Sequence, residues 1–375
     1  MYIGIPREIR GEETRVAATP ETVKKFTVKN LHVVLVQSGA GAGANISDES
    51  YQAAGATIVN SAKDLYSQSE IVLKVRAPES SELAMMRKDA LLLGLLSPHH
   101  VEEIEIMARY GLTAFAMEKL PRISRAQSMD VLSSQANIAG YKAVLVAANI
   151  YQKFLPMLMT AAGTVKAARV LVLGAGVAGL QAIATAKRLG AIVEAFDVRP
   201  VAKEQVESLG AKFIEVPSNS EEKSQAETTG GYAREMSEEY KRLQNELVHE
   251  RAILADIIIT TALIPGRPAP VLIKEETVRA MKSGSVIVDM AVEAGGNCPL
   301  SELNKTVVKH GVHLIGIANL PGLVASDSSA LYSRNLMNFL SLLLDSDSGE
   351  LKLDREDEII SGTLVCINGE IIIKN

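Results

Sequence analysis

The sequence has few cysteines and no long hydrophobic run. Of its 375 residues only Cys298 and Cys366 are cysteines, which excludes a disulfide framework and favours a reducing compartment. A membrane-spanning helix needs about 18 or more apolar residues, whereas the longest runs, such as residues 90–96, have the length of a core strand. The start of the chain is strand-like and charged, unlike a signal peptide. We therefore expect a soluble, cytoplasmic protein, which could still dock onto a membrane complex.

The chain also lacks an excess of positive charge. Its 39 Lys and Arg residues are scattered among 44 Asp and Glu residues, which gives a formal net charge of −5 at pH 7. Nucleic-acid binding requires a clustered basic surface, so this composition speaks against it. The histidines are dispersed, and no group of His, Cys and Asp residues has metal-ligand spacing. We therefore expect neither a metal nor a nucleic-acid partner, and we interpret His249, His310 and His313 as structural or surface residues.

Apolar residues are plentiful and make up 47% of the sequence. A chain of 375 residues is too long for one ordinary domain, so we expect two. In roughly the first 130 residues, short apolar runs alternate with helical segments, which is typical of a parallel sheet with crossover helices. The predicted strands of this region are residues 2–5, 33–36, 71–75, 90–96 and 112–116.

A second set of six apolar runs predicts a complete, doubly wound nucleotide-binding sheet. These runs are residues 169–173, 192–196, 212–214, 257–260, 286–289 and 314–317. A long helical pattern at 128–152 is predicted to bridge the two domains, and a helical stretch at 330–344 to pack back on the first. The predicted fold class is α/β, with two Rossmann-like doubly wound domains. We place the first domain at residues 1–135 with 325–375 and the second at 136–324.

One turn in the second domain has the pattern of a dinucleotide-binding site. The run at 170–173 ends in G-x-G-x-x-G, formed by Gly174, Gly176 and Gly179, and an apolar helical stretch follows. The first glycine permits a tight turn, the second lets the backbone approach a pyrophosphate, and the third lets the helix pack close to the strand. The helix start supplies free N–H groups and the positive end of a dipole. The pattern predicts a nucleotide site, and a tight turn without a ligand is the alternative.

The end of the next strand bears on the choice of nucleotide. Asp197 follows the run 192–196, where a carboxylate would accept hydrogen bonds from an adenosine ribose and repel a 2′-phosphate. Arg199 is the competing signal, because arginine can bind that phosphate; a contact with the adenine or a solvated surface charge is its alternative. Since Asp197 holds the strand end, we predict NAD(H) rather than NADP(H).

A polar and charged segment interrupts the pattern at 218–239. Long polar excursions between core strands are often lids or binding loops, and a solvated helical insertion is the alternative. Gly230 and Gly231 beside Tyr232 favour a mobile loop.

Four segments resemble a known family. Residues 121–130, PRISRAQSMD, resemble the arginine-glutamine-aspartate loop in the NAD(H)-binding component of the proton-translocating NAD(P) transhydrogenases. The similarity continues at 159–164, 260–266 and 292–299 and spans essentially the whole chain. It implies a homodimer carrying NAD(H), a separate NADP(H)-binding component, and a membrane-spanning component that couples hydride transfer to proton translocation. Because this chain has no membrane segment, it would be a separate subunit or a fragment, peripheral at the inner (plasma) membrane through partner subunits.

The resemblance also implies which residues form the nicotinamide end of the site. Hydride transfer between two nicotinamides moves no substrate proton, so such a site positions the cofactor rather than supplying an acid or base. Arg122 and Gln127 are expected to donate to the nicotinamide amide or ribose. Asp130 is expected to orient them and Ser133 to bond the carboxamide, which makes these four the predicted catalytic residues.

The fingerprint and the resemblance together predict a larger set of cofactor contacts. They are Arg122, Gln127, Ser128, Met129, Asp130, Gly174, Ala175, Gly176, Val177, Ala178, Gly179, Asp197, Val198, Arg199, Gly231, Tyr232, Gln244 and Leu263. Gln244 and Leu263 rest on the family pattern, and Leu263 lies just after the fourth strand, at the ligand edge of the sheet. Tyr141 and Tyr232 are either contacts of the nucleotide and its covering loop or ordinary packing residues.

Two other functions remain open at this point. Arg15 and Lys74 match the residues with which alanine dehydrogenase binds its substrate's carboxylate and carbonyl. That enzyme carries its catalytic histidine at a strand end, where this chain has residues 93–97, LGLLS, and Glu293 replaces its active-site aspartate. The histidines at 99–100 follow Pro98 in what reads as a helix start, so amino-acid oxidation is in doubt. A non-catalytic NAD-binding regulatory protein is the third possibility, although a sensor has no need of a nicotinamide-polarising loop.

Overall fold

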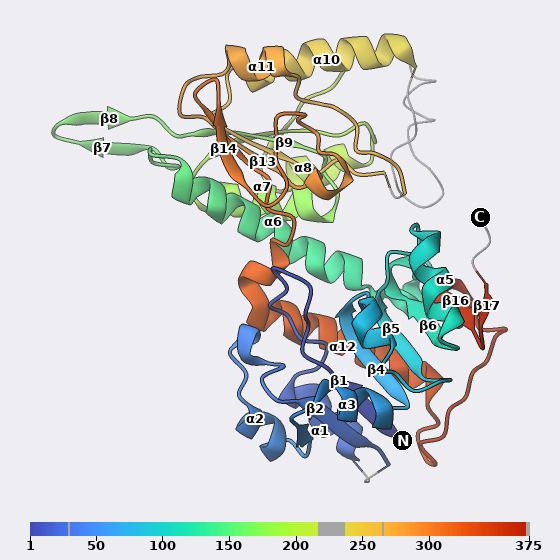
Figure 1. Ribbon diagram of the computed structural model, residues 1–375. Helices are drawn as coiled ribbons and strands as arrows, with labels where there is room; N and C mark the ends of the chain where they lie inside the picture. The colour runs from blue at the N-terminus through green and yellow to red at the C-terminus, as the bar shows by residue number, and fades with distance from the viewer. Residues whose placement is uncertain (29–30, 217–236, 265, 373–375) are drawn as a thin grey trace. The chain divides into compact units, whose positions relative to one another are not determined.

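The computed structural model describes residues 1–28, 31–216, 237–264 and 266–372. It divides into two compact units, Met1–Gln135 with Pro321–Asn375, and Ala136–Leu320 (Figure 1). Each unit contains a parallel-dominated sheet with helices, so the predicted α/β fold with two Rossmann-like halves is confirmed. Most of the segment predicted to be a lid, including Gly231 and Tyr232, lies outside the described residues.

The first unit is built on an eight-stranded sheet with the order β17-β16-β6-β5-β4-β1-β2-β3. Its strands are β1 (Tyr2–Ile5), β2 (Val33–Gln37), β3 (Thr57–Val59), β4 (Ile71–Arg76), β5 (Leu91–Leu95), β6 (Thr113–Ala116), β16 (Leu364–Ile367) and β17 (Glu370–Ile371). The strands from β6 to β3 pair in parallel, whereas β16 and β17 are antiparallel additions at the edge. All five predicted strands are present. The sequence analysis missed β3, β16 and β17, of which β3 and β17 are too short to show a strand pattern.

Helices cover both faces of this sheet. One face carries α1 (Pro20–Thr27), α2 (Asp48–Ala53), α12 (Ala325–Leu343) and α13 (Glu358–Thr363). The other face carries α3 (Ala62–Gln68), α4 (Ser80–Leu83) and α5 (Val101–Arg109). Alternate strand residues enter the two cores, so that on β4 Leu73 belongs to the first core and Val72 to the second.

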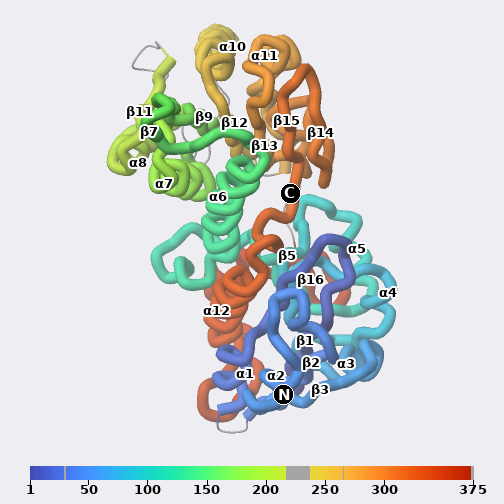
Figure 2. The backbone as a smooth tube through the Cα atoms, turned by 90° about the vertical axis from the view of Figure 1, so that its left-hand side faces the viewer, coloured from blue at the N-terminus to red at the C-terminus, as the bar shows by residue number. Residues whose placement is uncertain are grey.

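The helix α12 ties the end of the chain to the first sheet. It lies beside α1 (Figure 2), and Phe339 meets Phe115 of β6 edge to face, with ring centroids 5.5 Å apart. The prediction that the stretch 330–344 packs on this unit is confirmed, but the helix begins earlier, at Ala325. It begins earlier because Ser328 and Ser329 are buried and hydrogen-bonded rather than exposed in a loop.

The second unit is built on a seven-stranded sheet with the order β11-β10-β9-β12-β13-β15-β14. Its strands are β9 (Arg169–Leu173), β10 (Ile192–Phe196), β11 (Lys212–Phe213), β12 (Ile257–Thr260), β13 (Val286–Asp289), β14 (Thr306–Lys309) and β15 (Val312–Ile315). Only β14 is antiparallel within this sheet. The six predicted strands are present, but β15 lies two residues before the predicted 314–317. Its register follows the tight turn to β14 at His310 and Gly311, which the sequence analysis did not predict.

Helices also cover both faces of the second sheet. The long helix α6 (Val131–Ile150), predicted at 128–152, packs with α7 (Val177–Arg188) and α8 (Ala202–Ser208) on one face. The other face carries α10 (Glu238–Ala252) and α11 (Glu275–Ala280). Strands β7 (Leu158–Thr160) and β8 (Gly163–Val165) form a separate hairpin (Figure 1). Across the described residues of the chain, no helix combines the length and apolar character that crossing a membrane demands.

Candidate functional site

The chain's own packing requires glycine at two positions of the fingerprint turn. Gly174 has φ +99°, and a Cβ there would lie 2.5 Å from Thr261 Oγ1. Thr261 Oγ1 in turn donates to the Gly174 carbonyl oxygen at 3.0 Å, which closes β12 onto the turn. A Cβ on Gly179 would lie 1.8 Å from the Gly174 carbonyl oxygen, so any side chain there would push α7 away from the strand. These two glycines therefore serve the fold.

Gly176 is different, because nothing in the described protein fills the space in front of it. A Cβ built on Gly176 would have a single heavy atom within 4 Å, Arg199 Nη2 at 3.9 Å. Its φ of −76° also suits any residue. Gly176 is the N-cap of α7, a helix of 12 residues, and Val177 at its first turn is 39% exposed. The open backbone at this helix start is what a pyrophosphate would require.

Asp197 joins the glycine turn to Arg199. It follows β10, is 9% exposed, and accepts a hydrogen bond at Oδ2 from the Ala175 N–H at 2.7 Å. Arg199 donates to Oδ2 through Nη2 at 2.7 Å, and to Oδ1 through Nε at 2.9 Å and its backbone N–H at 2.8 Å. Each carboxylate oxygen thus has two donors. The arginine that competes with the acid in the sequence is its ion-pair partner in the fold.

A buried acid at the end of β13 organises the loops next to this turn. Asp289, fully buried, accepts backbone N–H groups of Ala291, Asn297 and Cys298 at 3.0–3.1 Å, and the Thr260 hydroxyl at 3.2 Å. Burial of an ionisable carboxyl is costly unless it is hydrogen-bonded, and these donors meet that need. The sequence analysis missed Asp289, although an acid that closes a V-I-V strand was the available signal.

Asn297 carries the order of that loop to the loop after β12. Its Nδ2 donates to the carbonyl oxygens of Ala262 and Pro270 at 2.9 and 2.8 Å, and its Oδ1 accepts from the Ala262 N–H at 3.2 Å. Leu263, the next residue, is held at the carboxyl end of the sheet with 46% of its surface exposed. Glu293 lies exposed in a short 3-10 turn, Val292–Ala294, of the neighbouring loop.

The predicted nicotinamide loop belongs to the first unit. Residues Ser124–Met129 form a 3-10 helix in which Ala126 and Met129 are buried, while Arg122 and Gln127 are exposed. Ser128, whose contact was also predicted, is exposed as well. The loop therefore grips the core with two apolar side chains and presents its polar ones outward.

Asp130 and Ser133 lie together at the start of α6. Asp130 Oδ1 accepts the Ser133 backbone N–H at 2.9 Å, and Oδ2 accepts the Ser133 hydroxyl at 2.6 Å. Asp130 thus caps the helix and orients the Ser133 hydroxyl at once. Of the remaining predicted contacts, Gln244 on α10, Ala178 on α7 and Val198 are half-buried. Tyr141 on α6 is 40% exposed.

Arg15 and Lys74, the residues shared with alanine dehydrogenase, are engaged in buried ion pairs. The Arg15 guanidinium donates to both oxygens of Glu13 at 2.7 Å and to Gln135 Oε1 at 2.8 Å. Lys74 Nζ lies 2.6 Å from Glu82 Oε1 and 3.3 Å from Glu8 Oε2. Burial raises the pKa of the Glu8 carboxyl, and the Lys74 ammonium opposes that rise.

The strand end that would carry a dehydrogenase histidine is closed by another carboxylate. β5 ends at Leu95, and Glu118 accepts the N–H groups of Leu96 and Ser97 at 3.1 and 2.7 Å. Burial raises the pKa of Glu118. His100 is the N-cap of α5 and is exposed, so the expected helix start after Pro98 is confirmed.

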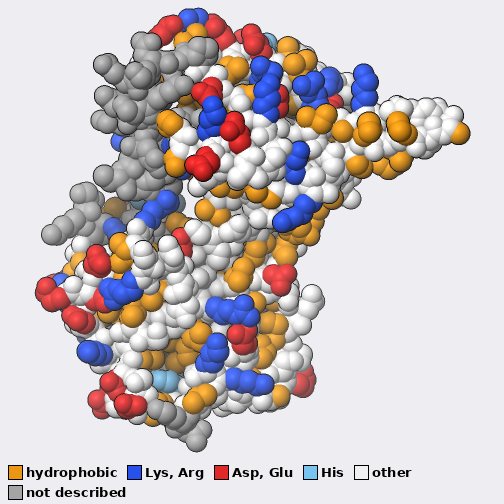
Figure 3. Space-filling model, turned by 180° about the vertical axis from the view of Figure 1, so that it is seen from behind, with side chains coloured by type: hydrophobic (Ala, Val, Ile, Leu, Met, Phe, Trp, Pro, Cys, Tyr) orange, Lys and Arg blue, Asp and Glu red, His pale blue; other side chains and the backbone are white. Residues whose placement is uncertain are grey.

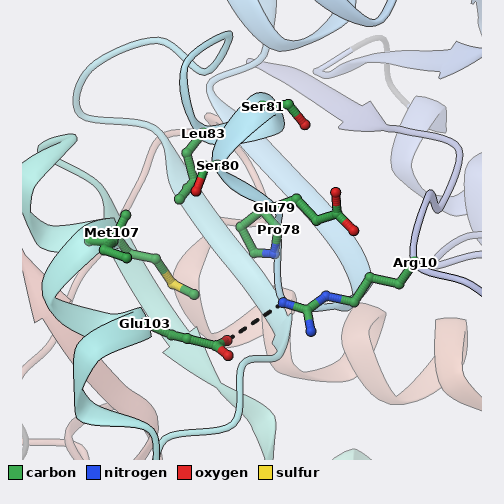
Figure 4. Close-up of a pocket in the computed structure, with 9 residues that line it drawn as sticks. Arg10, Pro78, Glu79, Ser80, Ser81, Leu83, Glu103 and Met107 are labelled. Atoms are coloured by element: carbon green, nitrogen blue, oxygen red, sulfur yellow. Dashed lines mark ion pairs between the residues drawn. The ribbon is translucent and has the colours of Figure 1, made fainter.

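A hollow of about 430 Å³ lies elsewhere on the first unit (Figure 4). None of the predicted site residues lines it. Its cation, Arg10, is 3.6 Å from the Glu103 carboxylate and donates to the Ala77 carbonyl oxygen at 2.8 Å. Glu79 adds further negative charge, so this hollow does not suit a nucleotide phosphate.

Two family descriptions cover nearly the whole chain. Residues 4–139 match the alanine dehydrogenase/PNT N-terminal domain, and residues 143–374 match the alanine dehydrogenase/PNT C-terminal domain. The chain belongs to the alanine dehydrogenase/PNT family. The resemblance inferred from residues 121–130 and the glycine turn is therefore confirmed.

Within the family, the chain is more similar to transhydrogenase subunits than to alanine dehydrogenases. It is 54% identical to the first of the NAD(P) transhydrogenase subunit alpha polypeptides of Rhodospirillum rubrum, over 99% of this chain and 98% of the relative. The crystal structure of transhydrogenase from Sinorhizobium meliloti superposes with a TM-score of 0.87 at 47% identity, covering 99% of this chain and 100% of that one. Alanine dehydrogenase from Mycolicibacterium smegmatis is 31% identical over 92% of this chain and 88% of the relative.

Proposed function

We propose that this protein is the NAD(H)-binding component of a proton-translocating NAD(P) transhydrogenase. It would bind NAD(H) and exchange a hydride with NADP(H) held on a partner component. The single observation that carries nucleotide binding is Gly176, the one fingerprint glycine that the protein's own packing does not require. The transhydrogenase assignment is supported by the relatives of that name, which match the chain over its full length.

The residues present fit a dinucleotide. The open backbone at Gly176 and the first turn of α7 offer N–H groups to a pyrophosphate, and Asp197 with Arg199 lies beside that turn. Bound NAD(H) supplies the hydride chemistry of its nicotinamide. The loop at 121–130 would orient that ring through Arg122 and Gln127, with the Ser133 hydroxyl held ready by Asp130. We propose the two compact units as the two domains, and this loop and the turn as their respective contributions.

We further propose that the chain forms a homodimer through the β7–β8 hairpin. All six strand residues of this hairpin are exposed, and a two-stranded hairpin alone is marginal in water. Figure 3 shows apolar side chains along the projecting hairpin. Those around it with large exposed surface are Phe154 (56%), Met157 (62%), Leu158 (38%), Met159 (71%) and Val165 (40%). A second copy of this chain would cover this apolar arm.

The other components would account for the rest of the reaction. An NADP(H)-binding component would accept or supply the hydride, and a membrane-spanning component would couple the exchange to proton translocation. The relatives named subunit alpha support assembly with further subunits. In this arrangement the chain is cytoplasmic and attaches to the inner (plasma) membrane through its partners.

A stopped-flow experiment tests the function directly. Purified chain loaded with NADH is mixed with a purified NADP(H)-binding component and an NADP analogue with a shifted absorbance, and rapid hydride transfer is expected. The same chain alone is assayed for NAD reduction with alanine. Negligible alanine oxidation is expected, because Glu118 rather than a histidine acts at the end of β5. Robust alanine oxidation without hydride transfer would identify a dehydrogenase instead.

A further inference from the structure

Two side chains from α12 hold one backbone carbonyl in the middle of the loop 121–130. Asn335 Nδ2 donates to the Ser128 carbonyl oxygen at 2.8 Å, and Asn338 Nδ2 donates to the same oxygen at 3.0 Å. The two asparagines are three residues apart and therefore share a face of the helix. Two donors satisfy both lone pairs of the carbonyl oxygen. We call this arrangement the asparagine clamp.

The clamp is itself held in place. Asn335 is 8% exposed, and its Oδ1 accepts a hydrogen bond from Ser134 Oγ at 2.7 Å, which determines the end of the amide that faces Ser128. The helix that carries it is anchored to the sheet, because the buried Tyr332 hydroxyl donates to the Lys74 carbonyl oxygen at 2.8 Å. The amides are thus presented from a rigid element.

An ion pair restrains the same loop at a second place. The Arg125 guanidinium donates two hydrogen bonds to Asp357, at 2.6 and 2.7 Å. Asp357 is the N-cap of α13, where its side chain accepts the Ile359 N–H at 2.8 Å. A bidentate pair of this kind fixes orientation as well as distance. With Arg125 and the Ser128 carbonyl engaged inward, the loop can present Gln127 in only one direction.

We propose that Asn335 and Asn338 are positioning residues for hydride transfer. By holding the Ser128 carbonyl, they set the geometry in which the neighbouring Gln127 and Asp130 meet the nicotinamide; this inference rests on the proposed function. A misplacement of about 1 Å can slow a reaction by about 100-fold. The glycine turn, which would carry most of the nucleotide affinity, lies in the other unit. Loss of the clamp should therefore reduce the rate of transfer far more than NADH affinity.

The variants separate the clamp from general damage to α12. Asn338→Leu removes one donor at similar volume, whereas Asn338→Gln retains an amide. Asn335→Asp keeps the acceptor for Ser134 but sets a carboxylate oxygen against the Ser128 carbonyl. Ser341→Ala is the matched control, since Ser341 lies on the same helix and its hydroxyl donates to the Asn338 carbonyl oxygen at 2.7 Å.

Three measurements read the variants. Hydrogen exchange follows the amides of Ala126 and Asp130, which close the loop onto the carbonyl oxygens of Ile123 and Gln127 at 3.0 and 3.3 Å. Equilibrium dialysis gives the NADH Kd of the full chain, and single-turnover stopped flow with the NADP(H)-binding component gives the transfer rate. For Asn335→Asp and Asn338→Leu we expect exchange to rise and transfer to slow by about tenfold or more. NADH Kd should change by less than about threefold, and Asn338→Gln and Ser341→Ala should behave like the wild type.

Each other outcome has a defined meaning. Unchanged exchange at both amides, or normal transfer in the Asn335→Asp, Asn338→Leu double variant, overturns the clamp. Equal losses of NADH binding and thermal stability assign the asparagines a merely structural role and also overturn it. If the wild type transfers no hydride while the exchange responds as expected, the clamp on the loop stands and the proposed function falls. The two failures are therefore distinguishable.

Discussion

Arg199 binds Asp197 through its backbone and its side chain together. Its N–H and Nε donate to Oδ1 at 2.8 and 2.9 Å, and its Nη2 donates to Oδ2 at 2.7 Å. The Ala175 N–H, also 2.7 Å from Oδ2, ties the pair to the glycine turn. An incoming adenosine ribose therefore meets an acid whose charge is already balanced by an arginine. Discrimination between the two nucleotides should depend on the net charge of this pair.

Changing either partner should shift nucleotide preference in opposite directions. Asp197→Asn should weaken NADH binding by roughly ten- to hundredfold, because a charge-assisted hydrogen bond contributes about 1.5–3 kcal/mol. It should also narrow the preference for NADH over NADPH, since Arg199 is then unbalanced. Arg199→Ala leaves the acid alone and should widen that preference. Equilibrium dialysis with both reduced nucleotides measures this, and equal wild-type affinity for NADH and NADPH would refute the assignment.

The fingerprint glycines should separate stability from binding. Gly176→Ala adds a methyl group into open space and should leave the thermal midpoint nearly unchanged. It should nevertheless weaken NADH binding at least about tenfold, because the backbone can no longer approach the pyrophosphate. Gly179→Ala should destabilise the fold by about 1–3 kcal/mol or more, since its Cβ would overlap the Gly174 carbonyl oxygen. Urea unfolding and NADH titration of both variants suffice, and full NADH affinity in Gly176→Ala would contradict the proposed site.

Two exposed residues of the nicotinamide loop should have different kinetic signatures. Gln127→Ala should slow hydride transfer to the partner about tenfold or more while leaving the NADH Kd nearly intact, because it is proposed to position the ring. Arg122→Ala should weaken NADH itself, since it removes a charge-assisted donor. Stopped flow at saturating NADH, combined with dialysis, separates the two effects. Identical behaviour of the two variants would argue against distinct roles.

The Arg125–Asp357 pair predicts a pH dependence of stability. The hydrogen bonds from Arg125 hold the pKa of Asp357 below its ordinary value of 3.8. A carboxyl with a lowered folded-state pKa contributes stability above its unfolded pKa, and that contribution is lost as pH falls through the folded value. Asp357→Asn should therefore destabilise the chain at pH 7 and at pH 5, with the difference vanishing well below pH 3.8.

The comparison isolates the ion pair because asparagine is also a good N-cap for α13. Urea unfolding at each pH measures the difference, and Arg125→Gln should reproduce it without further loss in the double variant. A difference between wild type and Asp357→Asn that stays constant down to low pH would show that the pair contributes nothing.

The hairpin predicts how the oligomer can be broken. Met159→Asp places a charge on the exposed arm, where Met159 is 71% exposed, and should convert a dimer into a monomer. Val308→Asp is the matched control, because Val308 is 58% exposed on the edge strand β14 of the same unit. Light scattering after size-exclusion chromatography reports the mass. A monomeric wild type, or a Met159→Asp protein that stays dimeric, would remove the hairpin from the interface.

The strands, the glycine turn and the family could all be predicted from the order of residues. Buried parallel strands read as short apolar runs such as 169–173 and 257–260, and both lie where the pattern predicts them. The loop at 121–130 carried the family in its local order of residues. These features are local, because they depend on neighbours only a few positions apart.

Which side chains meet was set by the packing of the whole fold. Asn335 and the Ser128 carbonyl are 207 positions apart, and they come together only because α12 packs on the first sheet. Asp289 and Asn297 gain their meaning from the sheet order, which sets β13 beside β12. The sequence likewise presented Asp197 and Arg199 as rival signals, and the turn after β10 made them partners. A hydrogen bond depends on distances of a few tenths of an ångström, and such distances are set by packing across the fold rather than by residue type.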